Sequence, residues 1–161
     1  MEVNQTIKTF SNGCSLVVAT EEHALCLAPH LRPYDILECR TLGHEPYEAL
    51  VFGLENDNET YTVLTPEGVP IAMFGTGRNP LTHEAYIWLL GSDKLRNVGL
   101  QFLRECKDIV QWLVEPYGEA SNYVYARYKT TVRWLAWMGA TFQEPTEICG
   151  LPFIKFTLKA L

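Results

Sequence analysis

The sequence predicts an α/β domain whose central sheet is mixed and mostly antiparallel, with helices flanking it. The first indication is an apolar, aromatic-rich run at residues 85–90 that leads through a polar turn into a long amphipathic pattern. The second is a hairpin signal, in which residues 60–64 and 69–75 flank a turn containing Pro66 and Gly68. The third is the succession of further strand-like and helix-like segments on both sides of these two features.

The chain is organised around residues 85–113. Residues 85–90 read as a buried strand, and the turn at 91–93 supplies Ser92 or Asp93 as the cap of a following helix. From Leu95 to Leu113 apolar residues recur every three or four positions, which predicts a helix of roughly five turns. The N-terminus of a helix carries free N–H groups and a positive dipole end, so this point could hold a phosphate.

The segments before this stretch contain a predicted N-terminal hairpin and three helices. Residues 6–10 and 15–19 read as strands, and Thr20 as the N-cap of a helix that ends near Pro29. Helical structure restarts at residue 31 and ends near Gly43. A third helix is predicted over 47–54 and a loop over 56–58.

After the long helix the pattern predicts a strand at 122–126, a helix at 130–138 closed by Gly139, and strands beginning at 141 and covering 153–158. A length of 161 residues suits one domain. We expect residues 1–18 to be an N-terminal extension or hairpin and residues 19–161 to form the single domain.

Composition excludes several classes of function. The net charge is −6 and no basic stripe is present, which disfavours nucleic-acid binding. No apolar run reaches the roughly 18–20 residues that span a bilayer, and residues 1–10 lack a signal-peptide core.

The odd number of cysteines, five, indicates reduced thiols, with Cys26 and Cys106 expected in the core. His30 and His44 lack metal-ligand spacing, so no metal site is predicted.

Two stretches carry a family resemblance: LRPYDILECRTLGHEPYEALVFGL at 31–54, and NYVYARYKTTVRWLAWMGATF at 122–142 with GLPFIKFTL at 150–158. With IAMFG and IWLLGSD between them, they resemble the small internal virion proteins of T7-like podoviruses, which are similar to GNAT N-acetyltransferases in fold. The resemblance covers most of the chain from Ala19 onward. It implies a phage protein of the virion interior or host cytoplasm, whose partners are other virion or phage assembly proteins. The predicted element order also matches the GNAT fold.

Active GNAT enzymes carry Arg/Gln-x-x-Gly-x-Gly/Ala at the start of the long helix, where backbone N–H groups hold the pyrophosphate of acetyl-CoA. This sequence has Arg96 and Gly99 but Gln101 at the last position. If the protein is active, the resemblance implies an acetyl-CoA site made by Leu90, Gly91, Ser92, Arg96 and Gly99. Alternatively, Arg96 is a solvated helix residue and Gly99 a close-packing one.

The catalytic positions of the fold are only partly filled. The tyrosine that protonates the coenzyme A thiolate in such enzymes corresponds to Leu135, which cannot donate a proton. Tyr128 stands seven residues earlier, at the position where such enzymes often have an asparagine, and it could replace the tyrosine from one helical turn away or simply pack. Glu84 is the leading candidate for the general base, ahead of His83, and the alternative is a polar loop before a strand.

Arg32, Asp35 and Glu38 form a polar cluster within one helical turn, and the two acids share a face. They could border an acceptor site for a basic amine, or form ion pairs that fix the start of the helix. The abundant aromatic residues, Trp134 and Trp137 among them, belong either to the core or to a partner surface.

Two functions therefore compete. The first is a virion or assembly protein that keeps the GNAT fold as a scaffold, with degenerate catalytic residues and an exposed aromatic patch. The second is an acetyl-CoA-dependent N-acetyltransferase acting on a protein or small amine, which requires an open split between strands 85–90 and 122–126. A third possibility is binding of an acyl-CoA or nucleotide without turnover. A side chain that plugs the split argues against the enzyme.

Overall fold

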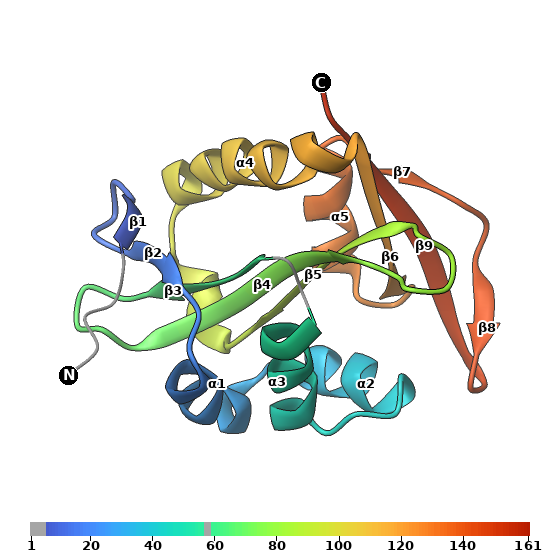
Figure 1. Ribbon diagram of the computed structural model, residues 1–161, viewed down its shortest axis with the longest axis horizontal. Coiled ribbons are helices and arrows are strands. Elements are labelled where there is room, and N and C mark those ends of the chain that lie inside the picture. The colour runs from blue at the N-terminus through green and yellow to red at the C-terminus, as the bar shows by residue number, and fades with distance from the viewer. Residues whose placement is uncertain (1–5, 57–58) are drawn as a thin grey trace.

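The computed structural model describes residues 6–56 and 59–161. Residues 1–5 of the predicted N-terminal extension, and residues 57 and 58 of the predicted loop, lie outside the described residues. The described chain forms a nine-stranded sheet with the order β1-β2-β3-β4-β5-β6-β9-β7, and β8 pairs with β9. Helices α4 and α5 lie on one face and α1, α2 and α3 on the other (Figure 1). The predicted fold class is confirmed.

The strands are β1 (Thr6–Thr9), β2 (Ser15–Val18), β3 (Glu59–Leu64), β4 (Pro70–Arg78), β5 (Ala85–Gly91), β6 (Glu119–Tyr125), β7 (Thr141–Phe142), β8 (Thr146–Ile148) and β9 (Leu151–Lys159). The helices are α1 (Glu21–Leu27), α2 (Pro33–Thr41), α3 (Pro46–Asn56), α4 (Leu100–Val114) and α5 (Lys129–Trp137). Short 3₁₀ turns η1 (Ala28–His30), η2 (Asp93–Asn97) and η3 (Glu115–Tyr117) connect them.

Local chemistry explains the element boundaries. In the β3–β4 turn Gly68 takes a φ of +84°, a left-handed conformation that costs glycine little. Thr20 caps α1 by accepting a hydrogen bond from the N–H of His23, whose ring accepts one from the N–H of Thr20 in return. Pro33 opens α2 because the first turn of a helix needs no N–H from it.

Strand β4 shows how the sheet separates two hydrophobic layers. Successive side chains of a strand point to opposite faces, so Ala72 and Phe74 enter the core under α4 and α5 while Met73 enters the core under α1, α2 and α3. In the second layer α3 approaches the sheet closely because Gly53 lies against the indole of Trp88. Packing in these two cores holds the helices on both faces in place against the sheet, including the ends of β5 and β6.

The predicted five-turn helix over 95–113 is wrong at its N-terminal end. Residues Asp93–Asn97 form the 3₁₀ turn η2, Gly99 has a φ of +86°, and α4 begins only at Leu100. A left-handed residue cannot continue an α-helix, so Gly99 divides the apolar pattern into two elements. A Cβ on Gly99 would meet nothing within 4 Å, so the alternative that this glycine allows close packing is also wrong.

The remaining differences are small. Strand β8 was not predicted, and Cys26 is exposed rather than in the core because it lies on the outer side of α1. Cys106 is half-buried and packs against the larger core, as predicted. Within residues 6–56 and 59–161, no helix combines the length and apolar character needed to cross a membrane.

Candidate functional site: the split between β5 and β6

The two central strands β5 and β6 run parallel and part almost at once. Only one residue pair, Tyr86 with Ser121, is in register between them. Beyond this pair the carboxamide of Asn122 lies between the strands. Its Nδ2 donates to the carbonyl of Ile87 at 2.9 Å, and its Oδ1 accepts from the N–H of Tyr123 at 2.7 Å. The side chain therefore takes the place of the next main-chain bond of the ladder.

Helix α2 reaches across the wide end of the split and binds the β5 side. The main-chain N–H of Gly91 donates to Oδ2 of Asp35 at 2.9 Å, and the carbonyl of Gly91 accepts from the N–H of Arg32 at 2.9 Å. Leu31 and Ser92 form an isolated antiparallel bridge beside this pair of bonds. The segment before α2 thus occupies the last positions on this edge of β5.

The same helix binds the β6 side. The main-chain N–H of Tyr125 donates to Oε1 of Glu38 at 3.0 Å. Asp35 and Glu38 are three residues apart and share one helix face, so a single turn of α2 connects the two diverging strands. The predicted split is present, and at Gly91 and Tyr125 its edges are bound by carboxylates of the chain itself.

Burial dominates the electrostatics of this cluster. Asp35 is 1% exposed, and burial raises its pKa although Arg32, at 2.9 Å, and the Gly91 N–H oppose the rise. Burial raises the pKa of Glu38 to about 7, with a further increase from the charge of Asp35 and an opposing effect of the Tyr125 N–H.

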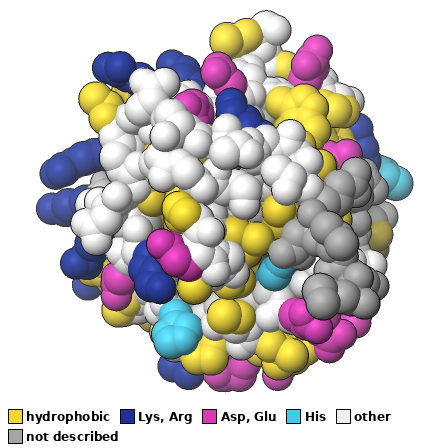
Figure 2. Space-filling model, turned by 90° about the vertical axis from the view of Figure 1, so that its left-hand side faces the viewer, with side chains coloured by type: hydrophobic (Ala, Val, Ile, Leu, Met, Phe, Trp, Pro, Cys, Tyr) yellow, Lys and Arg dark blue, Asp and Glu magenta, His cyan; other side chains and the backbone are white. Residues whose placement is uncertain are grey.

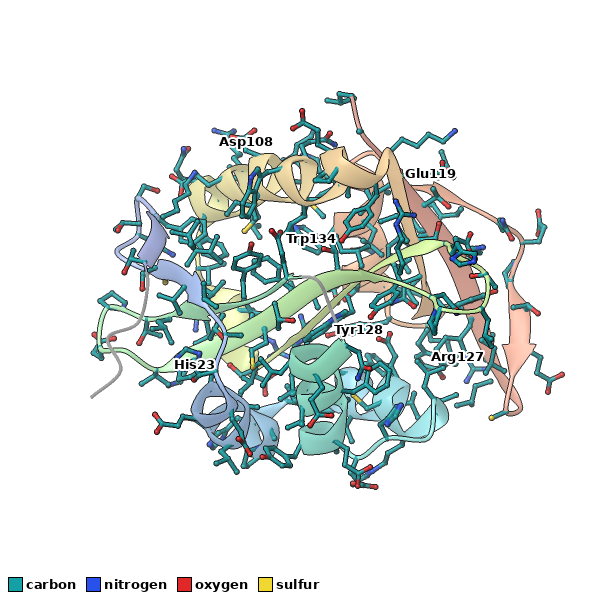
Figure 3. All side chains as sticks on the ribbon, in the orientation of Figure 1. His23, Asp108, Glu119, Arg127, Tyr128 and Trp134 are labelled. Atoms are coloured by element: carbon teal, nitrogen blue, oxygen red, sulfur yellow. The ribbon has the colours of Figure 1, made fainter. Side chains whose placement is uncertain are left out.

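Aromatic rings close the outer side of the cluster. The ring of Tyr34 lies 5.4 Å from that of Tyr125 and 4.8 Å from that of Tyr128. The guanidinium of Arg32 lies 5.3 Å from the centre of the Tyr128 ring. In Figure 3, Tyr128 lies between α2 and α5. These contacts join α2 to the start of α5 over the end of β6.

The predicted catalytic residues lie in different surroundings. Tyr128 is buried at the N-cap of α5, its hydroxyl has no hydrogen-bond partner among the described residues, and burial raises its pKa to about 12. Leu135 is buried in the core. The Glu84 carboxylate accepts a 2.8 Å bond from Nζ of Lys155 on β9 at the closed end of the split, and its side chain is 52% exposed. His83 stands in the turn before β5 with a φ of +61°.

The predicted cofactor residues divide into two groups. At the end of β5, Leu90 packs in the core under α1, α2 and α3, while Gly91 and Ser92 face the segment before α2. Arg96 and Gly99 belong to the stretch leading into α4, where Arg96 makes an exposed contact of 3.7 Å with Asp93. The described residues contain no group of histidine, cysteine and acidic side chains able to hold a metal.

Sequence reasoning found Asp35 and Glu38 but assigned them only to an acceptor site or to local ion pairs. Ion pairing with Arg32 is present for Asp35. The hydrogen bonds to Gly91 and Tyr125 were missed, as was the position of Asn122 between the strands. One signal was available, since Asn122, with poor strand propensity, stands at the start of the predicted strand NYVYA; the structure extends this strand back to Glu119, so that Asn122 lies inside β6.

No protein-family model matches this chain, and no curated protein matches its sequence. Solved structures do match its fold. A GNAT-family acetyltransferase from Bacillus anthracis superposes with a TM-score of 0.64 at 8% identity, covering 97% of both chains. A putative phosphinothricin N-acetyltransferase gives 0.62 at 13% identity over 92% of this chain and 99% of the other. A ribosomal α-N-protein acetyltransferase in complex with coenzyme A gives 0.60 at 9% identity over 97% and 98%.

These similarities define the class of fold: the chain has the GNAT acetyltransferase fold over essentially its whole length. The predicted GNAT-like fold is confirmed.

Proposed function

We propose that this chain is a phage protein of the virion interior or host cytoplasm that keeps the GNAT fold as a scaffold for binding other virion or assembly proteins and does not transfer acetyl groups. One observation carries the proposal. The groups along the split that a coenzyme A arm would contact are bound by Asp35, Glu38 and Asn122 of the chain itself.

The strength of these bonds makes them an obstacle to a cofactor. In this fold the pantetheine arm lies between the two central strands. An arm entering here must displace Asp35 from Gly91 and Glu38 from Tyr125. A hydrogen bond to a charged group contributes about 1.5–3 kcal/mol, so losing two weakens binding by roughly two to four orders of magnitude. A micromolar site would become one with a Kd of roughly 0.1–10 mM.

The catalytic positions support the same proposal. By the resemblance, Leu135 corresponds to the proton-donating tyrosine of such enzymes, and its side chain is buried in the core. The high pKa of Tyr128 does not prevent it from acting as an acid, but its hydroxyl is buried against α2. Exposed aromatic side chains, including Trp112 and Trp137 at 44% each, offer surface for protein contacts.

An acetyl-CoA-dependent N-acetyltransferase acting on a protein or small amine is the second candidate. Two observations favour it. The space around Gly99 is open at the start of α4, as a pyrophosphate site requires. Glu38 has a pKa of about 7, which suits a general base at neutral pH, whereas the carboxylate of Glu84 is engaged in an ion pair with Lys155.

Titration calorimetry with acetyl-CoA and with coenzyme A tests both candidates. The scaffold proposal expects no binding tighter than about 0.1 mM in either titration. Micromolar binding would overturn it, provided that Gly99→Trp abolishes the signal and Gly118→Trp does not. Gly118 is a matched control, since it lies beyond the other end of α4 with a similarly positive φ and open space around its Cα. Circular dichroism verifies that both variants fold.

The phage assignment has a separate test. Mass spectrometry of purified, nuclease-treated virions of the phage that encodes the chain should detect it as a virion component. Its absence from particles, together with presence in the lysate, would leave a role in assembly or in the host cytoplasm. Absence from both would contradict the assignment.

A further inference from the structure

The two helical layers of the molecule differ in net charge. Residues 20–56, which include α1, α2 and α3, hold seven acidic and two basic side chains. Residues 93–137, which include α4 and α5, hold seven basic and five acidic ones. In Figure 2 acidic and hydrophobic side chains intermix along the lower edge of the molecule, the level at which Figure 1 places α1, α2 and α3. The acidic layer therefore also presents apolar surface.

A shallow hollow of about 310 Å³ lies on the outer side of α3 in this acidic layer. Its floor includes Phe52, which is 49% exposed and whose ring lies 5.5 Å from that of His44. Tyr47 is held in place because its hydroxyl donates to the Glu21 carboxylate at 2.9 Å. The residues that line the hollow are His44, Tyr47, Glu48, Val51, Phe52 and Glu55.

The two acids of the hollow lie at its opposite ends. Glu48 and Glu55 are seven residues apart on α3, or about 10 Å along the axis at 1.5 Å per residue, and Val51 and Phe52 lie between them on the same face. Both are exposed, and neither forms an ion pair with any residue that the structure describes. The hollow thus joins unneutralised carboxylates to an open aromatic face.

We propose that this hollow docks a basic segment of another protein, with two arginine side chains about 10 Å apart that meet Glu48 and Glu55. A guanidinium group suits both features, because it pairs with carboxylates through a planar fork and stacks on aromatic rings. The inference rests on the proposed function, since a protein that acts by association needs such a surface. It names one partner class for that function.

The distance of about 10 Å between Glu48 and Glu55 determines how far apart the arginines of a test peptide should lie. A polyproline II segment rises about 3.1 Å per residue with three residues per turn, so arginines at positions i and i+3 lie on one side about 9 Å apart. The probe is a fluorescein-labelled Gly-Arg-Pro-Pro-Arg-Gly peptide. Its control is Gly-Pro-Pro-Arg-Arg-Gly, which has the same composition and charge with adjacent arginines. Fluorescence anisotropy at about 50 mM salt measures both, because low salt keeps exposed charge pairs effective.

Two variants and a matched control locate the binding. Phe52→Ala removes the ring and keeps all charges, and is expected to weaken binding about 3–5-fold, the size of an exposed cation–π contact. Glu48→Gln with Glu55→Gln is expected to weaken it about 10-fold, since exposed pairs contribute up to about 1 kcal/mol each. Glu22→Gln with Glu67→Gln removes the same charge from exposed sites outside the hollow and should change affinity less than 2-fold.

The outcomes separate this inference from the proposed function. Preference for the spaced peptide, with loss in the two hollow variants alone, supports it. Equal binding of both peptides, or equal weakening in the Glu22/Glu67 control, would mean diffuse attraction to an acidic surface and would overturn it. Absence of peptide binding, with self-association lost in Phe52→Ala, would assign the hollow to a second copy and overturn it too. None of these outcomes bears on acetyl-CoA binding, which the calorimetry tests independently.

Discussion

The carboxylate of Glu38 on α2 accepts a hydrogen bond of 3.0 Å from the main-chain N–H of Tyr125 on β6, 87 residues further along the chain. One turn earlier on the same helix, Asp35 accepts from the N–H of Gly91 on β5. A helix therefore holds together two strands that have already separated. The measurable consequences concern pH, local hydrogen bonding and packing.

Stability should depend on pH through Glu38. Its pKa is about 7 in the folded protein against 4.5 as the ordinary value, so between these pH values the folded state keeps a proton that the unfolded state releases. The free energy of unfolding then falls as pH rises from 4.5 through 7, by at most about 1.4 kcal/mol per pH unit. Glu38→Gln keeps the acceptor for Tyr125 and removes the titration.

Urea unfolding at several pH values between 5 and 8 measures this slope. We expect Glu38→Gln to reduce it and to be more stable than the wild type at pH 8. Part of the slope should remain, because burial also raises the pKa of Asp35. Exposed Glu67→Gln is the control. Equal slopes in wild type and Glu38→Gln would disprove the role of this carboxyl.

Asp35→Ala should be strongly destabilising. The substitution leaves the Gly91 N–H and the Arg32 guanidinium without their acceptor in a buried position, which costs about 3 kcal/mol or more. Asp35→Asn keeps an acceptor for Gly91 and should lose less. Thermal and urea unfolding at neutral pH measure the free energy of unfolding of both variants. A surface substitution typically changes it by no more than about 0.5 kcal/mol. An alanine variant within that range of the wild type would contradict the role given to Asp35.

Asn122→Leu should open the junction between β5 and β6. It removes the donor to Ile87 and the acceptor for Tyr123 while filling a similar volume, and we expect a loss of about 1–2 kcal/mol. The more specific readout is amide hydrogen exchange, in which the Tyr123 N–H should lose protection. If the Tyr123 N–H kept its protection in the variant, another acceptor of the protein would have replaced the carboxamide, and the role given to Asn122 would be wrong.

Gly53→Ala tests the approach of α3 to the sheet. A Cβ at Gly53 would overlap the indole of Trp88, and such overpacking costs about 1–3 kcal/mol. Gly43→Ala provides a contrast, because its Cβ meets nothing and only its φ of +89° is unfavourable, at a cost of about 1–2 kcal/mol. Urea unfolding measures the stability of both variants. The near-ultraviolet circular dichroism of the folded proteins should show an altered tryptophan environment only in Gly53→Ala, because only this substitution contacts Trp88.

The sequence allowed the element order to be predicted because each strand and helix has its own hydrophobic period. Residues 85–90 and the hairpin at 60–75 were placed to within a few residues of β5, β3 and β4. The break before α4 was not predicted, since the apolar spacing runs through η2 and Gly99 without interruption. Periodicity reports which side of an element is buried and does not report a single left-handed residue.

The candidate site was predictable only in part. A split between strands 85–90 and 122–126 followed from the resemblance, but the bond from Tyr125 to Glu38 depends on tertiary packing between segments 87 residues apart. The position of Glu84 just before the central strand was predicted correctly. Its ion pair with Lys155 on β9 could be predicted only with knowledge of the strand order in the sheet. Short-range patterns contain no information on such pairings.

The single main-chain pair between Tyr86 and Ser121 also has a mechanical meaning. On either side of it the sheet is a continuous antiparallel ladder, β1 to β5 on one side and β6 with β9 on the other. Bending at this line breaks few main-chain bonds, whereas bending between β3 and β4, between β4 and β5 or between β6 and β9 breaks a long ladder. The main-chain ladder between the central strands is therefore thinnest at this line, and α2 bridges it by accepting hydrogen bonds from the N–H groups of Gly91 and Tyr125.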